Sequence, residues 1–190
     1  KYFARIIAAY GYSVELDRIM DGYCVKHEVD VLAKMGNEHH IIECKYHIDG
    51  GKPADVKVAL YIHSRFEDIR KAYESNKGEE IIKQGWLVTN TRLTTDAIKF
   101  AECVGLKIVS WKYPEKESLE RLIEDKRLYP VTILTSAKKD SLRLLFSSDI
   151  ILAQEIAEMD EEVFLKRSGL DMDTARALKK EADKLCPCLS

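Results

Sequence analysis

The sequence predicts an α/β protein in which helices flank a mixed β-sheet and a small helical module follows. Apolar and polar residues alternate, as in strands, in short segments of residues 12 to 46. Helical and strand patterns then alternate between residues 55 and 113, which is typical of βαβ units. Helical periodicity predominates beyond that point. We therefore expect one domain over residues 1–113 and a helical module over residues 114–190.

The first part of the chain predicts a helix followed by three strands. Residues 1–10 place their apolar side chains on one helical face, and Gly11 ends this helix. Residues 12–16 alternate as a strand, and residues 25–46 are rich in strand-forming residues. The Gly36-Asn37 pair in the middle of this second segment fits a two-residue hairpin turn.

The next part predicts helix, strand, helix and strand. Apolar residues from 55 to 73 recur at steps of three and four, which predicts a long amphipathic helix. A buried-type strand at 86–89, a helix capped by Thr94 or Thr95 that ends near residue 104, and a strand at 106–111 complete the domain. This order implies a mixed sheet with helices on its faces.

The module over residues 114–190 is predicted to be helical, with a short strand pattern only at 131–134. A first helix at 155–166 and a second from Thr174 enclose a turn containing Gly169, which resembles a helix-hairpin-helix turn. In such a turn, glycine lets backbone N–H groups approach a DNA phosphate, and Lys179 on the second helix would add a cation. A structural or protein-docking role is the alternative, because the module carries more acidic than basic residues.

Composition excludes several classes of protein. With 46% hydrophobic and 33% charged residues and 9 glycines among 190 residues, the chain is neither collagen-like nor largely disordered. No apolar run approaches the roughly 20 residues of a membrane span, so we expect no membrane partner. The net charge of -2 means that any nucleic acid would bind to a local patch. Five cysteines cannot all pair, which favours the reducing cytoplasm.

Asp30, Glu43 and Lys45 form the combination of residues that predicts chemistry. If Gly36 and Asn37 are the turn, Asp30 lies opposite Glu43, with Cβ atoms roughly 4.5 to 5.5 Å apart. A divalent cation would relieve the repulsion between these carboxylates, and Mg²⁺ commonly binds one or two carboxylates together with water and phosphate oxygens. Lys45 shares the face of Glu43 and could act on an attacking water or on the phosphate. The alternative is a solvated hairpin face with an ordinary Lys-Glu pair.

Two sequence segments resemble a known family. Val29-Asp30-Val31-Leu32, followed by Ile41-Ile42-Glu43-Cys44-Lys45-Tyr46, is similar to the PD-(D/E)xK nucleases, specifically the Mrr-type restriction endonucleases and archaeal Holliday-junction resolvases. The resemblance covers roughly residues 1–111. It implies a restriction-endonuclease-like fold and metal-dependent cleavage of DNA phosphodiester bonds. It also implies that Asp30 and Glu43 bind Mg²⁺ or Mn²⁺ and that Lys45 is the catalytic lysine.

Three further basic residues are candidates for DNA contacts. Lys57 and Arg65 lie on the helix at 55–73, and Arg92 lies between a strand and a helix N-terminus, where anions often bind. A solvated helix face and ordinary helix capping explain these residues equally well.

The sequence therefore predicts a cytoplasmic, magnesium-dependent endonuclease or resolvase-like enzyme with DNA as its partner. One alternative is a DNA-binding or regulatory module that keeps the nuclease fold without turnover. Another is a sensor or assembly subunit with an upstream nucleotide-binding domain, since the chain starts inside a helix and some Mrr-like domains follow an ATP-cone domain. The oligomeric state stays open, although many such nucleases act as homodimers.

Overall fold

The computed structural model describes residues 1–46, 53–75 and 80–186. The chain divides into two compact units, with Phe3–Leu122 in the first and Ile123–Ser190 in the second. The division falls later than the predicted boundary after residue 113, because the segment that follows is bonded to the first unit. The N–H groups of Leu119 and Glu120 donate to the carbonyl oxygens of Ser110 and Trp111.

The first unit has the predicted order of helix, three strands, helix, strand, helix and strand. Its elements are α1 (Tyr2–Ala9), β1 (Ser13–Asp21), β2 (Lys26–Met35), β3 (Glu38–Lys45), α2 (Val56–Ser75), β4 (Ile81–Thr89), α3 (Thr95–Val104) and β5 (Lys107–Val109). The strands β1 and β4 are longer than predicted and β5 is shorter. Thr94 caps α3 by accepting a hydrogen bond from the Ala97 N–H.

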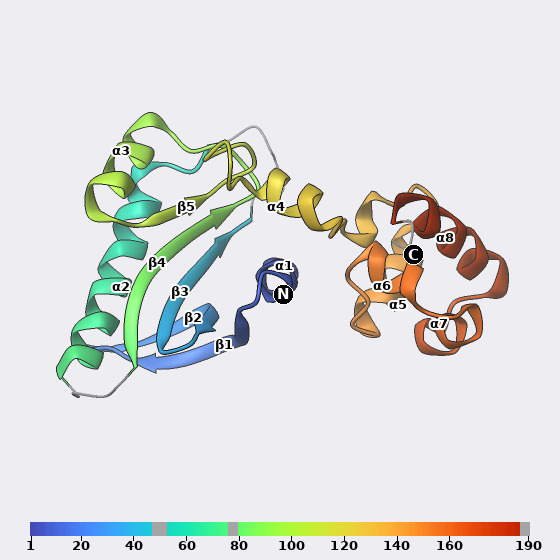
Figure 1. The fold of residues 1–190 in the computed structure, drawn as a ribbon, viewed down its shortest axis with the longest axis horizontal. Helices are drawn as coiled ribbons and strands as arrows, with labels where there is room; N and C mark the ends of the chain where they lie inside the picture. Colours follow the sequence, from blue (N-terminus) through green and yellow to red (C-terminus); the bar gives the residue numbers. More distant parts are fainter. Residues whose placement is uncertain (47–52, 76–79, 187–190) are drawn as a thin grey trace. The chain divides into compact units, whose positions relative to one another are not determined.

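A five-stranded mixed sheet forms the centre of this unit, with strand order β1-β2-β3-β4-β5 (Figure 1). The pairs β1-β2 and β2-β3 are antiparallel, whereas β3-β4 and β4-β5 are parallel. The helices α2 and α3 pack against one face, where Phe66 and Ile69 of α2 join Leu32 and Ile41 of the sheet. The predicted α/β class, with a mixed sheet flanked by helices and followed by a helical region, is confirmed.

The β2-β3 hairpin has the predicted register. Val31 pairs with Ile42 and Leu32 with Ile41, and Gly36 in the turn has a φ of 59°. The left-handed φ is costly for a residue with a Cβ atom, which explains the glycine. Asp30 and Glu43 lie just beyond the last paired residues, one on each strand.

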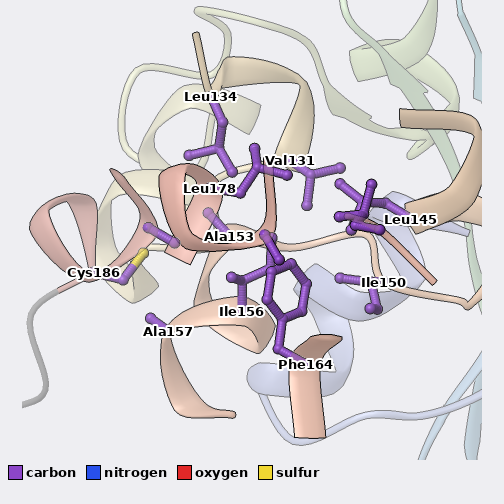
Figure 2. Packing of buried hydrophobic residues seen from close by; sticks show 13 residues of the cluster. Val131, Leu134, Leu145, Ile150, Ala153, Ile156, Ala157, Phe164, Leu178 and Cys186 are labelled. Atoms are coloured by element: carbon purple, nitrogen blue, oxygen red, sulfur yellow. The ribbon is translucent and has the colours of Figure 1, made fainter. Parts of the chain in front are cut away.

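The second unit is helical. After α4 (Leu119–Lys126), which crosses the division, it contains the 3₁₀ turn η1 (Val131–Ile133), α5 (Lys139–Ser147), α6 (Ala153–Glu158), α7 (Glu161–Ser168) and α8 (Met172–Leu185). Phe164, Leu145, Ile156 and Leu178 are fully buried in its core (Figure 2). The helices thus bury a continuous apolar cluster within this unit.

Two predictions for this second unit were wrong. Residues 131–134 do not form a strand, because Val131–Ile133 is a 3₁₀ turn and only Pro130 makes an isolated bridge, with Leu152. The helix predicted at 155–166 is two helices, because Met159 and Asp160 adopt extended backbone, with ψ of 142° and 148°. Asp160 is a favoured residue at a helix N-cap, and the acidic residues that follow it suit the first turn of a helix.

None of the helices in the described part of the chain is long and apolar enough to span a membrane. The sequence likewise contains no apolar run of the length that a membrane span requires.

Candidate active site

Asp30 is held at the point where the strands β2 and β3 stop pairing. Its Oδ2 accepts a hydrogen bond from the backbone N–H of Cys44, with an N···O distance of 2.8 Å. In a regular ladder a backbone carbonyl would accept from such an N–H group. The Asp30 carboxylate therefore takes the place of a backbone acceptor and is fixed beside Glu43 and Lys45.

Glu43 points toward α2 and is largely buried. Its side chain is 15% exposed, and Oε1 lies 2.6 Å from Nη1 of Arg65, whose side chain is 14% exposed. The two groups are not aligned as a hydrogen bond, so this buried oxygen has no directed donor. The Arg65 guanidinium also lies 5.3 Å from the ring centroid of Tyr61. Arg65 thus connects the Glu43 carboxylate to an aromatic ring on the same helix.

The surroundings of Glu43 disfavour its ionised form. Burial raises the pKa of Glu43 to about 7, and the negative charge of Asp30 adds to this increase, while Arg65 and Lys45 oppose it. The negative charge of Asp30 thus adds to the effect of burial in disfavouring the ionised form of Glu43. A cation close to both carboxylates would favour their ionised forms.

Glu43 and Lys45 open onto a pocket of about 240 Å³ between β3 and α2. Its lining consists of Glu43, Cys44 and Lys45 from the sheet and Lys57, Val58, Tyr61 and Ile62 from the helix. Lys45 and Lys57 thus line the same pocket, one from the sheet and one from the helix. Such a hollow, with a carboxylate and two amines, suits a phosphate bound next to a cation.

The two carboxylates fit a hard cation such as Mg²⁺. The buried Glu43 Oε1 lacks a directed donor, and Asp30 uses only Oδ2 for its backbone bond. Within the described ranges no group of three or more His, Cys, Asp or Glu side chains could hold a metal ion. Asp30 and Glu43 would therefore bind the ion with water and substrate oxygens as its other ligands, as is common for Mg²⁺.

Arg92 lies at a different position along the same edge of the sheet. It is exposed in the loop between β4 and α3, and its carbonyl oxygen accepts from the Ala54 N–H at 2.9 Å. This backbone bond ties the loop to the chain just before α2. The contact of the Arg92 side chain with DNA stays a prediction.

The predicted phosphate contacts in the second unit have partners inside that unit. Gly169 ends α7 with a φ of 67°, and its N–H donates to the Leu165 carbonyl at 3.2 Å. Nζ of Lys179 donates to the carbonyl of Ala157 and to Oδ1 of Asp183, both at 2.8 Å. DNA binding at Gly169 and Lys179 stays a prediction that gains no support from these contacts.

Two features of the site were missed from the sequence. Arg65 was predicted to contact DNA, but here it pairs with Glu43. Tyr61 was not singled out, although it lies on the pocket wall. The spacing of four residues between Lys57, Tyr61 and Arg65 could have identified both, because residues at this spacing share one helical face.

Comparison with known proteins finds a matching family, a similar sequence and a similar solved structure. Residues 129–186 match a family described as AF1548-like, C-terminal. An uncharacterized protein of Archaeoglobus fulgidus is 36% identical over 182 residues, which cover 96% of this chain and 98% of that protein. The crystal structure of a protein of unknown function, AF1548, has a TM-score of 0.79 and 36% identity, and the match covers 96% of this chain and 93% of that one.

Proposed function

The chain belongs to the AF1548-like family, and we propose that its sheet-containing unit is a metal-dependent nuclease that hydrolyses DNA phosphodiester bonds. The observation that carries the proposal is the approach of the Asp30 and Glu43 carboxylates beside Lys45, at the end of the β2-β3 pairing. The resemblance of these strands to PD-(D/E)xK nucleases supports the same function.

The residues of the site would have different roles. Asp30 and Glu43 would hold Mg²⁺ or Mn²⁺, which when bound supplies a water of lowered pKa and positive charge beside the scissile phosphate. The Lys45 ammonium would orient the attacking water or stabilise negative charge on the phosphate oxygens. Lys57, on the helix side of the pocket, would bind a neighbouring phosphate. This contact would fix the position of the DNA strand relative to the site.

The variant Lys45→Ala tests this assignment. We expect it to abolish cleavage of labelled single-stranded, duplex and branched DNA in Mn²⁺, because the lysine acts on the reacting groups. Manganese binding measured by calorimetry and the melting temperature should both stay near their wild-type values, because Lys45 is exposed and is not a metal ligand. Asp30→Ala should instead weaken manganese binding as well as cleavage.

A matched lysine provides the control. Lys26 lies at the start of the same strand as Asp30, its side chain is 74% exposed, and it is not among the residues that line the pocket. Lys26→Ala should cleave like wild type. Cleavage by Lys45→Ala at the wild-type rate would contradict the nuclease proposal.

A second candidate is a DNA-binding module of the same fold without turnover. The Arg65 contact favours it, because a guanidinium 2.6 Å from Glu43 Oε1 already neutralises the carboxylate that a cation would need. The two candidates differ in metal binding. If calorimetry detects no Mn²⁺ binding to wild type even with DNA present, the binding module is the better description.

We also infer a reducing, cytoplasmic location. The four cysteines that the structure describes, Cys24, Cys44, Cys103 and Cys186, are all free thiols. Free thiols are usual where glutathione and thioredoxin keep cysteine reduced.

A further inference from the structure

Three exposed aromatic side chains lie along one edge of the first unit. The strands β3, β4 and β5 are parallel, so their carboxyl ends meet at the same edge of the sheet (Figure 1). Tyr46 follows β3 and is 73% exposed, and Trp111 follows β5 and is 40% exposed. Tyr61 on α2 is 62% exposed and lines the pocket at this edge.

Backbone hydrogen bonds join the segments that carry these rings. The Trp111 N–H donates to the carbonyl of Thr91, in the loop after β4, at 3.4 Å. The carbonyl oxygen of the next residue in that loop, Arg92, accepts from the N–H of Ala54, two residues before the start of α2. The loop after β4 thus links the segment after β5 to the beginning of the helix that carries Tyr61.

Cationic side chains lie among the rings. Lys45 is adjacent to Tyr46 in sequence, Lys57 lies one helical turn before Tyr61, and Arg92 is exposed in the connecting loop. Single exposed apolar residues are ordinary on protein surfaces. Aromatic residues interspersed with cations are instead typical of surfaces where bases stack and the phosphate backbone is neutralised.

Tyr61 is the ring that is best placed for such stacking. It shares the pocket with Glu43 and Lys45, and the guanidinium of Arg65 lies 5.3 Å from its ring centroid. Arg65 is itself held by Glu43. The Tyr61 ring therefore lies beside the ion pair of Arg65 and Glu43.

We propose that this edge, comprising Tyr46, Tyr61, Trp111, Lys45, Lys57 and Arg92, binds unpaired nucleotides. The substrate class is then DNA with a single-stranded segment next to the cleaved phosphate. In continuous duplex the bases stack on one another, so their faces are not available to Tyr61. The cleavage step rests on the proposed nuclease function, whereas the binding step does not.

Binding without cleavage tests the inference. Fluorescence anisotropy in EDTA compares a labelled oligothymidine with a duplex of the same length, for wild type, Tyr61→Ala and Tyr61→Phe. Loss of one stacked base predicts that Tyr61→Ala weakens oligothymidine binding by roughly 5- to 150-fold. Duplex affinity should change little, and Tyr61→Phe should keep the wild-type affinity because it keeps the ring.

Tyr23 offers a matched control. Its side chain is 58% exposed, but it lies between β1 and β2, outside the strand ends that form this edge. Tyr23→Ala should bind oligothymidine like wild type. Intrinsic fluorescence adds an independent measurement: the chain has 2 tryptophans. Since Trp86 is buried, quenching by oligothymidine would report on Trp111.

The outcomes separate this inference from the proposed function. Unchanged oligothymidine affinity in Tyr61→Ala, or an equal loss for duplex, would overturn the inference while leaving the Lys45 test untouched. The reverse is also distinguishable: Tyr61-dependent binding together with normal cleavage by Lys45→Ala supports the nucleotide-binding edge and rejects the nuclease. Wild type that binds duplex as tightly as oligothymidine would also overturn the inference.

Discussion

Replacing Glu43 by glutamine should make the protein more stable, and the gain should depend on pH. The pKa of Glu43 is raised from an ordinary 4.5 to about 7, mainly by burial, and its side chain is only 15% exposed. A group whose pKa is raised on folding adds stability below its unfolded pKa and loses it as the pH rises through the folded pKa. The wild-type protein therefore loses stability through this residue between about pH 4.5 and pH 7.

The size of the loss follows from the pKa difference. At 1.36 kcal/mol per pH unit, a rise from 4.5 to about 7 corresponds to about 3 kcal/mol of unfolding free energy. Glutamine resembles the protonated acid at all pH values. Glu43→Gln should therefore exceed wild type by about 1 kcal/mol at pH 5 and by about 3 kcal/mol at pH 8.

Urea denaturation of both proteins in EDTA, at several pH values from 5 to 8, measures this difference. Titration of carboxyl groups that do not interact with Glu43 affects both proteins alike and cancels in the comparison. Adding Mg²⁺ at pH 8 should stabilise wild type and have little effect on Glu43→Gln. A stability difference that stays constant with pH would show that Glu43 does not titrate as its burial implies, and the reasoning would be refuted.

Two further predictions concern packing. Phe164→Ala should destabilise the second unit by about 3–5 kcal/mol in urea denaturation, because this ring is fully buried, whereas Val163→Ala, at a position 52% exposed, should change stability by less than about 0.5 kcal/mol. Gly22→Ala should lower the unfolding free energy of the first unit by about 1–3 kcal/mol, because a Cβ atom there would overlap the Asp68 carboxylate and lie 2.5 Å from the Val25 carbonyl oxygen. A melting temperature of Gly22→Ala equal to that of wild type would show that this turn can relax at no cost.

Much of the first unit can be predicted from local patterns. The Gly36-Asn37 turn determines which residues of β2 and β3 pair. Counting residues outward from this turn places Asp30 opposite Glu43. The βαβ order follows from periodicity alone. In the second unit, residues 131–134 have strand-forming side chains but lack a neighbouring strand to pair with, and tertiary packing makes them a 3₁₀ turn.

The partner of Glu43 could not be predicted in the same way. The helix α2 carries several basic residues, among them Lys57, Arg65 and Arg70. The sequence predicts that each of them is a solvated cation. Which of them reaches Glu43 depends on how α2 lies across the sheet, and this depends on packing contacts such as Phe66 against Leu32 and Ile41. The sequence therefore predicts the acids of the site, while the geometry of the helix determines their counter-ion.

The energetics of Glu43 favour a functional role over a structural one. A buried carboxylate with a pKa near 7 lowers the stability of the folded protein at neutral pH, even though Arg65 partly offsets the cost. Apolar side chains of similar volume often replace a buried ion pair without loss of stability. A residue with such a cost, beside a second carboxylate and an open pocket, is typical of a site that binds a cation or reacts. Since a cation and Arg65 would compete for the same Glu43 oxygen, cation binding would free the guanidinium to contact another anion, such as a phosphate of the substrate.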